Sequence, residues 1–371
     1  MTTTLRVLIE QPTPLSDADS TQAARDVALA LAATTPRGCE VRAIAPSDAD
    51  ADLAGAMPSL AGVDRLAMPG AAVATLWRLG ARGGAGEGLI HSPSLAAPLV
   101  RHDRVHEHDQ TVVTLWDLRP WETPDELPRA AVAWARAMLK RAVRHADAVV
   151  VPTHSLARRL SEIAPLGDRV RVVSGAPASS FRVPSDEIGR RRDLTLPEGY
   201  LLASGSSAPS ANLRAAFEAI AATGRDTAVV VLDAPDGDEP AIVELASAAG
   251  LPERRLHIRG RLDAPDRAAV FAGAVAFIAA AEGGDYPWRV LDALRVGVPV
   301  VGADSETHRE ILLDGAVLTV PGDPAALAAG IDDTLSSTEA VERLSVLATD
   351  RGRAFTWAGA AERIWQLHAE L

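Results

Sequence analysis

Residues 277–304 read FIAAAEGGDYPWRVLDALRVGVPVVGAD, and this stretch decides the predicted fold. The apolar run over 275–281 predicts a buried strand, and two glycines predict a turn after it. A helix is predicted over 290–295 and a second buried strand over 299–303. Strand, turn, helix and strand make one βαβ unit. In such units a ligand binds at the carboxyl end of the first strand, where the helix N-terminus offers free amide groups to anions.

Two acidic residues flank this turn. Glu282 follows the first strand and Asp292 lies on the predicted helix. The simplest interpretation makes Glu282 a partner of the helix dipole and Asp292 part of a solvated helix face.

The same stretch resembles the donor-site signature of family 4 glycosyltransferases of the GT-B fold, E-G-F-G-L-P-x-x-E-A-x-x-x-G-x-P-V-V. The matching residues are Glu282, Gly283, Pro287, Asp292, Ala293, Gly297, Pro299, Val300 and Val301. In that family the first acid contacts hydroxyls of the donor sugar and the second holds the nucleotide ribose. The resemblance therefore implies these roles for Glu282 and Asp292, and it brings the backbone amides of Gly283, Gly284 and Asp285 to the sugar or the diphosphate.

Length and composition set limits on the function. A chain of 371 residues exceeds what one hydrophobic core usually organises, so two domains are expected. No apolar run is long enough to span a bilayer, and no N-terminal leader is expected. Cys39 is the only cysteine, which excludes a disulfide framework and fits a reducing cytoplasm. The net charge of −12 argues against general nucleic-acid binding.

The first half carries a motif after a β-branched strand over 111–115. Trp116, Asp117 and Arg119 follow it, where the family often reads V-x-x-H-D-L-x-P. The resemblance implies that these residues face the reacting centre. Tryptophan stands in the position of the histidine, so it stacks on a sugar or packs in the cleft but cannot carry a proton.

Other stretches of the first half favour structural roles. Residues 11–19 form an acidic loop without glycine, which would repel a phosphate and is predicted to be structural. His91 begins an H-S-P turn that resembles one facing the interdomain cleft in the family, with a plain turn role as the alternative. His102, His106 and His108 lack partner cysteines and predict a solvated loop rather than a metal site.

A long helix over 129–146 carries a basic stripe of Arg136, Lys140 and Arg144. A solvated face is the simpler interpretation. The alternative is peripheral contact with an anionic membrane surface, as suits enzymes that glycosylate lipid-linked acceptors.

The second half contains a strand that ends at Gly205, followed by a loop and a helix from Leu213. The family reads G-x-x-x-x-R-K-N-L here and binds the donor diphosphate with the Arg and Lys. Ser210 and Ala211 occupy these two positions, whereas Gly205 and Asn212 are kept. The hydroxyls of Ser206, Ser207 and Ser210 and the helix N-terminus are predicted to cradle an anion weakly, with ordinary N-capping as the alternative. Candidates for the missing positive charge are Arg259, Arg261 and Arg289, each of them more simply interpreted as a surface arginine.

Alternating strands and helices along the chain predict an α/β protein with two doubly wound Rossmann-like domains, the GT-B fold. We expect an acceptor-side domain over 1–176, a nucleotide-sugar donor domain over 177–354 and a terminal helix over 355–371 that crosses back. Residues 174–177, where the first domain is expected to end and the second to begin, and the basic run over 190–192 predict a linker.

The resemblance implies a metal-independent, retaining glycosyltransferase of a bacterium, with a role in cell-wall polysaccharide biosynthesis. It would move a hexosyl group from a UDP-, GDP- or dTDP-sugar to a glycan or lipid-linked acceptor in the interdomain cleft. No permanently bound cofactor is expected, and the location would be the cytoplasm or the inner face of the membrane. The alternative is a catalytically silent relative that binds a glycan or serves as partner to another glycosyltransferase, which the missing Arg-Lys pair and Trp116 favour.

Overall fold

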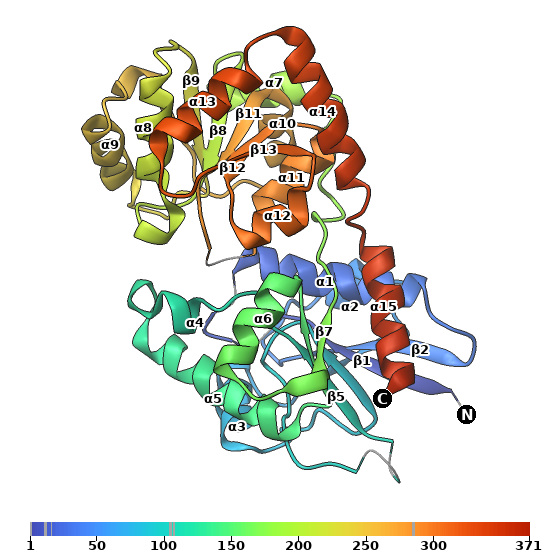
Figure 1. Ribbon diagram of the computed structural model, residues 1–371. Helices are drawn as coiled ribbons and strands as arrows, with labels where there is room; N and C mark the ends of the chain where they lie inside the picture. Colours follow the sequence, from blue (N-terminus) through green and yellow to red (C-terminus); the bar gives the residue numbers. More distant parts are fainter. Residues whose placement is uncertain (1, 11–12, 16, 104–105, 107, 284–285) are drawn as a thin grey trace. The chain divides into compact units, whose positions relative to one another are not determined.

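The computed structural model describes residues 2–10, 13–15, 17–103, 106, 108–283 and 286–371 (Figure 1). Contacts between residues divide the chain into two compact units. One comprises Met1–Ala178 and Thr356–Leu371, and the other comprises Ser179–Phe355. Gly284 and Asp285, which belong to the predicted donor loop, lie outside the described residues.

The first unit is built on a sheet in which every described strand pair is parallel. Parallel strands are covered on both faces and therefore read as continuous apolar runs, as in AVVV of β6. The strands follow one another across the sheet in the order β3 (Gly62–Arg65), β2 (Cys39–Ala45), β1 (Thr3–Leu8), β4 (Leu89–Ser92), β5 (Gln110–Thr114), β6 (Ala148–Val151) and β7 (Val170–Val172).

Helices cover both faces of this sheet (Figure 1). One face packs against α3 (Gly70–Leu79), α5 (Arg129–His145) and α6 (His154–Ile163) through a core that contains Trp77 and Met138. The other face is covered by α1 (Ala18–Ala33) and the terminal helix α15 (Trp357–Glu370), which pack against each other. The Trp365 indole N–H donates to the Leu31 carbonyl at 3.1 Å and fixes α15 to α1. The C-terminal helix thus belongs to the core of the first unit.

The second unit repeats the plan with a smaller parallel sheet. Its strands run in the order β10 (Leu256–Ile258), β9 (Ala228–Leu232), β8 (Tyr200–Ser204), β11 (Ala274–Ala279), β12 (Val300–Ala303) and β13 (Ala316–Thr319). One core joins the sheet to α8 (Leu213–Ala222), α9 (Glu239–Ala248) and α13 (Pro324–Thr334). The remaining helices are α7 (Glu187–Asp193), α10 (Ala264–Gly273), α11 (Trp288–Val296), α12 (Glu306–Leu312) and α14 (Thr338–Gly352).

The α/β prediction is confirmed, because both sheets are parallel and doubly wound. In each, the strand order reverses beside the first strand, between β1 and β4 and between β8 and β11. The end of α11 lies at Val296, one residue beyond the predicted end, and Gly297 caps the helix in the left-handed conformation at φ 83°.

The prediction of a linker over 190–192 was wrong. The basic run over 190–192 is not linker but part of α7, where Arg190 pairs with Asp186 and Asp266. The i,i+4 spacing of Asp186 and Arg190 is a helix signal that outweighs the bare run of charge. Neither the short helix α2 (Leu53–Ala56) nor β3 after it was predicted. Among the described helices, none has the length and apolarity needed to cross a membrane.

Candidate functional site

The candidate site lies at the carboxyl edge of the second sheet, where β8 and β11 lie side by side. Open parallel sheets bind ligands at such a reversal of strand order. The loops that follow these two strands are joined by Asn212, whose side-chain amide donates to the carbonyl of Ala280 at 3.0 Å. Asn212 adopts the left-handed conformation at φ 52°, which Asn tolerates better than most residues. The side chain predicted to bind the donor therefore holds the two loops together.

The loop after β8 needs glycine at its first position. Gly205 has a φ of 132°, and a Cβ there would lie 2.9 Å from the Cβ of Ala211. The rest of the loop is held by its own polar groups: the Ser206 hydroxyl accepts from the amide of Ala208 at 3.3 Å, and the amide of Ser207 donates to Asp238 at 2.7 Å. The loop is thus shaped before any ligand arrives.

Glu282 is exposed, three residues beyond the end of β11. A Cβ on Gly322, in the loop after β13, would lie 3.7 Å from Oε1 of Glu282. The carboxylate therefore lies at the same edge of the sheet as Gly205 and Asn212, beside a glycine that leaves space next to it. Gly283 is exposed too, with nothing within 4 Å of where its Cβ would be. Such an exposed carboxylate is available to accept hydrogen bonds from a ligand's hydroxyl groups.

Asp292 is not part of a solvated face; it is 1% exposed and lies in a buried ion-pair network. Its Oδ2 accepts from Arg267 Nε at 2.9 Å and from Arg289 Nη1 at 3.0 Å. Arg289 continues to Asp233, with Nε at 2.6 Å from Oδ2 and Nη2 at 3.2 Å from Oδ1. A buried carboxylate needs such partners, because an unpaired charge in the interior costs several kcal/mol, on the order of 3–5 when one partner is removed.

The interpretation of Arg289 as a surface arginine is therefore wrong. Arg259 is half-buried and donates to the carbonyls of Leu194 and Ile258, so its guanidinium is occupied by backbone. Arg261 is exposed. Of the three candidates for the missing positive charge, Arg289 alone is buried.

Asp233 and Arg267 were missed by the sequence analysis. Asp233 directly follows β9, and polar residues that follow a buried parallel strand lie at the ligand-binding edge, so this signal was present. Arg267 lies within α10 and stacks over the ring of Phe181 at 5.2 Å. No spacing in the sequence links Arg267 to Asp292, because the two meet only through packing of α10 against α11.

In the first unit, Trp116 and Asp117 follow β5 as predicted, but both have partners. Trp116 is buried, and its indole N–H donates to the Pro93 carbonyl at 2.9 Å. Asp117 accepts from the amide of Arg119 at 3.0 Å and from its Nη2 at 3.2 Å. Packing of Trp116 is the alternative that these contacts favour, while the catalytic roles of both residues stay predictions.

The acidic loop before α1 has a structural part, as expected. Asp17 caps α1 by accepting from the amide of Ser20 at 2.7 Å, and the Ser20 hydroxyl accepts from the amide of Asp17 at 3.2 Å. Glu10, before this loop, pairs with Arg25 of α1, with Nε at 2.7 Å from Oε1.

The predicted turn role of His91 is wrong. His91 lies within β4, is 1% exposed and packs edge-on against His368 of α15, with ring centroids 5.7 Å apart. Burial lowers the pKa of His91 well below its usual value and that of His368 to about 4, so both rings are neutral. His368 Nδ1 donates to Gln110 Oε1 at 2.9 Å, because an amide oxygen can only accept, so the proton of the neutral ring lies on Nδ1.

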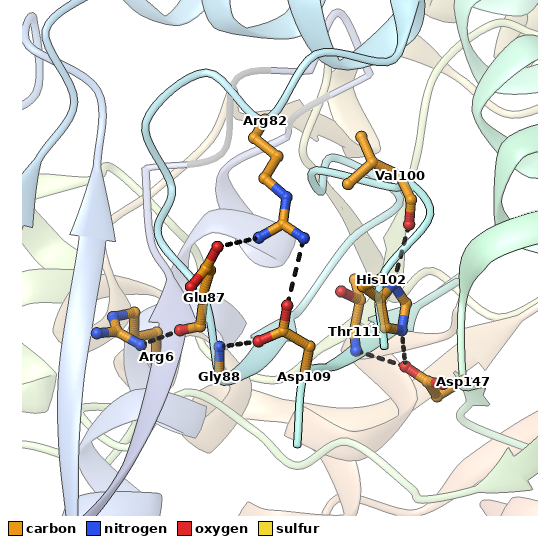
Figure 2. A network of polar contacts seen from close by, with 9 residues as sticks. All are labelled: Arg6, Arg82, Glu87, Gly88, Val100, His102, Asp109, Thr111 and Asp147. Carbon is orange, nitrogen blue, oxygen red and sulfur yellow. Dashed lines mark hydrogen bonds and ion pairs between the residues drawn. The ribbon is translucent and has the colours of Figure 1, made fainter. Parts of the chain in front are cut away.

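His102 does not lie in a solvated loop either (Figure 2). Its Nε2 is 2.8 Å from Oδ2 of Asp147, and its Nδ1 is 2.9 Å from the Val100 carbonyl. Asp147 also accepts from the amide of Thr111 at 2.7 Å. His106 is exposed, as predicted. Within the described ranges no group of three or more His, Cys, Asp or Glu side chains is placed to hold a metal ion.

Comparisons with known proteins show which proteins this chain resembles in sequence and in fold. Residues 200–337 match the family model described as "Glycosyl transferases group 1". A segment of 135 residues, 36% of this chain, is 31% identical to a phosphatidyl-myo-inositol mannosyltransferase of Mycobacterium leprae (strain TN). That segment spans 35% of the relative, so the sequence match covers about a third of its length.

Solved structures match the chain over its whole length. A sucrose-phosphate synthase from Thermosynechococcus elongatus superposes with a TM-score of 0.73 at 18% identity, covering 99% of this chain and 98% of that one. HepE of Anabaena in complex with UDP and glucose gives 0.71 at 17% identity, and both chains are covered completely, 100% each. A glycosyltransferase from Rickettsia africae ESF-5 gives 0.68 at 13% identity, with coverages of 100% and 98%.

These structures share the two-unit parallel architecture at low identity, and the family-model match over residues 200–337 lies in the unit that carries Glu282 and Asn212. The predicted GT-B fold is therefore confirmed, and the match of residues 200–337 to group 1 glycosyltransferases supports the resemblance to family 4 glycosyltransferases.

Proposed function

We propose that the chain is a retaining glycosyltransferase that takes a sugar from a nucleotide-sugar donor and transfers it to a glycan or lipid-linked acceptor. The observation that carries the proposal is the carboxyl edge of the second sheet, where exposed Glu282 and the loop 205–212 occur in a domain matched as group 1 glycosyltransferase. HepE, which shares the fold, has been crystallised with UDP-glucose, which supports this donor class.

In this proposal Glu282 accepts hydrogen bonds from hydroxyl groups of the donor sugar. The diphosphate lies against the amides at the start of α8 and α11, since helix N-termini stabilise anions. Arg289 supplies positive charge near the position of the absent Arg-Lys pair. Asp292 was expected to hold the ribose; its two arginine partners instead support a role in orienting Arg289.

The same reasoning makes the reaction metal-independent. Arginine and helix amides neutralise a leaving diphosphate without a cation, as the family implies. The acceptor-side roles of Trp116 and Asp117 remain proposals, as do contact with a membrane surface through α5 and a role in bacterial cell-wall polysaccharide synthesis.

A second candidate is a catalytically silent relative that binds a glycan or a partner glycosyltransferase. The observation in its favour is the state of the basic residues: Ser210 and Ala211 replace the Arg-Lys pair, and Arg289 is engaged by two aspartates. A protein of this kind would bind no nucleotide sugar.

Calorimetric titration of wild type and Glu282→Ala with UDP, GDP and dTDP and with their glucose conjugates tests the proposal. We expect one nucleotide series to bind at micromolar strength. The substitution should weaken the nucleotide sugar by about tenfold or more, because hydrogen bonds to a charged group contribute about 1.5–3 kcal/mol each, and leave the bare nucleotide unchanged.

The matched control is Glu244→Ala, which removes an exposed glutamate from α9 and should change neither affinity. Equal weakening of nucleotide and nucleotide sugar by Glu282→Ala would contradict the role of Glu282 at the sugar. Absence of binding to every donor would sink the transferase proposal in favour of the silent relative.

A further inference from the structure

The ion pair between Asp233 and Arg289 crosses the end of a strand. Asp233 directly follows β9, and Arg289 lies in the first turn of α11, the helix after β11. In the sheet, β8 lies between β9 and β11. The pair therefore spans the carboxyl end of β8, where the loop 205–212 begins.

The network formed by Arg267, Arg289, Asp233 and Asp292 has balanced formal charge. The exposure of its side chains is uneven: Arg267 is 6% exposed, Arg289 8% and Asp292 2%, whereas Asp233 is 20% exposed. Asp292 binds both arginines from the buried side. Asp233 is thus the member of the network that faces solvent, and among the described residues its carboxylate accepts hydrogen bonds from Arg289.

We propose that Asp233 sets the affinity for the donor by competing with its diphosphate for Arg289. The proposal rests on the proposed function, since it takes a nucleoside diphosphate as the ligand. Asp292 holds Arg289 from the buried side. The diphosphate takes the place of the Asp233 carboxylate on the Arg289 guanidinium. Arginine suits this exchange because its planar fork binds carboxylate and phosphate in the same bidentate way.

The formal charges predict that removal of the Asp233 carboxylate tightens binding of the diphosphate. While Arg289 is paired with Asp233, the formal charges of these four side chains sum to zero, which weakens their attraction for an anion. A ligand that binds only the released form has its apparent affinity reduced by the fraction released. If Arg289 spends about nine-tenths of its time on Asp233, removal of the carboxylate tightens binding roughly tenfold. A purely supporting role for Asp233 predicts the opposite, because loss of support would weaken binding.

The test uses the full-length protein with Asp233→Asn and Asp233→Gly. Asp233 has a φ of 63°, and Asn and Gly are the residues that tolerate this left-handed conformation, so both variants keep the loop geometry. Each is titrated with UDP, GDP, dTDP and inorganic pyrophosphate, and with uridine as a ligand without phosphate. Circular dichroism checks that each variant is folded. If Asp233→Asn does not fold, the binding of Asp233→Gly provides the test.

We expect both variants to bind the favoured nucleoside diphosphate about tenfold more tightly than wild type and uridine no more tightly. Adding Arg289→Met to Asp233→Asn should abolish the gain. The matched control is Asp236→Asn, which removes one charge from an exposed site in the same loop and should leave affinity unchanged. A gain in affinity of the same size in this control would show that the change in net charge causes the effect, and it would overturn the proposal.

Unchanged or weaker diphosphate binding by the Asp233 variants, in a protein whose wild type binds the nucleotide, overturns this inference and leaves the proposed function standing. Tighter pyrophosphate binding without binding of any nucleotide supports the competition at Arg289 and contradicts the nucleotide-sugar donor. Absence of binding to all of these ligands in wild type and variants overturns both.

Discussion

At the scale of single residues, buried charged groups in this molecule are stabilised by hydrogen bonds to defined partners. His102 is the clearest case outside the candidate site, because both of its ring nitrogens face acceptors: the Asp147 carboxylate and the Val100 carbonyl (Figure 2). Two acceptors require two N–H groups, and therefore the charged imidazolium. The hydrogen bond to Asp147 is the main reason why the pKa of His102 is raised above its ordinary 6.5.

This geometry predicts a pH-dependent contribution to stability. A group whose pKa is raised on folding stabilises the protein fully below its unfolded pKa of about 6.5, and this contribution is lost as the pH rises through the folded pKa. His102→Gln should therefore lower the free energy of unfolding by about 1–2 kcal/mol near pH 6 and by much less near pH 9. Urea denaturation of wild type and variant at both pH values measures the difference.

The control for this prediction is His106→Gln. The His106 side chain is 81% exposed and pairs with Asp103 in solvent, so its loss should matter little at either pH. A destabilisation by His102→Gln that is constant or grows with pH would show that the contact stabilises the neutral ring.

The residues of the candidate site could be predicted from the sequence only in part. Glu282, Gly205 and Asn212 could be named as candidates because each occupies a position in a local motif next to a strand end. The partners of Asp292 could not be found, since Arg267 and Arg289 reach it through helix packing that the sequence does not encode locally. Neither the ribose-binding role that the motif implies for Asp292 nor the solvated face taken as its alternative predicts this buried ion-pair network.

At the scale of secondary-structure elements, α11 depends on how its C-terminal end fits against α14. Gly297 and Gly250 both adopt left-handed conformations, at φ 83° and 81°. A Cβ on Gly297 would lie 2.3 Å from Oγ1 of Thr349 and 3.2 Å from the carbonyl of Ser345, whereas a Cβ on Gly250 would have no neighbour within 4 Å. The two sites thus share the backbone cost of a side chain but differ in crowding.

We expect Gly250→Ala to lower the free energy of unfolding by about 1 kcal/mol, the cost of the left-handed conformation alone. Gly297→Ala should cost about 2–3 kcal/mol, since Thr349 would also have to move and give up its 2.8 Å hydrogen bond to the Ser345 carbonyl. Urea denaturation of both variants measures this difference. Equal losses would contradict the close packing of α11 on α14.

Element types followed from the sequence where the apolar pattern was continuous. The strands of both sheets read as short runs of small and β-branched apolar residues, because parallel strands are buried on both faces. Among the elements that were missed, α2, β3 and α7 are short and have at most one fully buried residue each, so no apolar run marks them. Their formation depends on neighbours such as Arg42, which pairs with Asp64 of β3.

At the scale of the whole molecule, two parallel sheets of related design are joined so that the last helix returns to the first unit. That return is built from particular side chains, with Trp365 donating to Leu31 and Trp357 donating to the Pro177 carbonyl at 2.9 Å. The proposed chemistry requires only the second unit for donor binding. The central claim is therefore local: the carboxyl edge at β8 and β11 is the donor site.

Hydrogen–deuterium exchange of the full-length protein, with and without saturating UDP-, GDP- or dTDP-glucose, tests this claim most directly. We predict that one of these donors slows exchange in the loop 205–212 and in the first turn of α11, because bound phosphates accept hydrogen bonds from amides there and close this edge to water. Exchange in the network around His102 should not change. A donor that binds but leaves both segments unprotected, or that protects only the first unit, would contradict the assignment of the donor site.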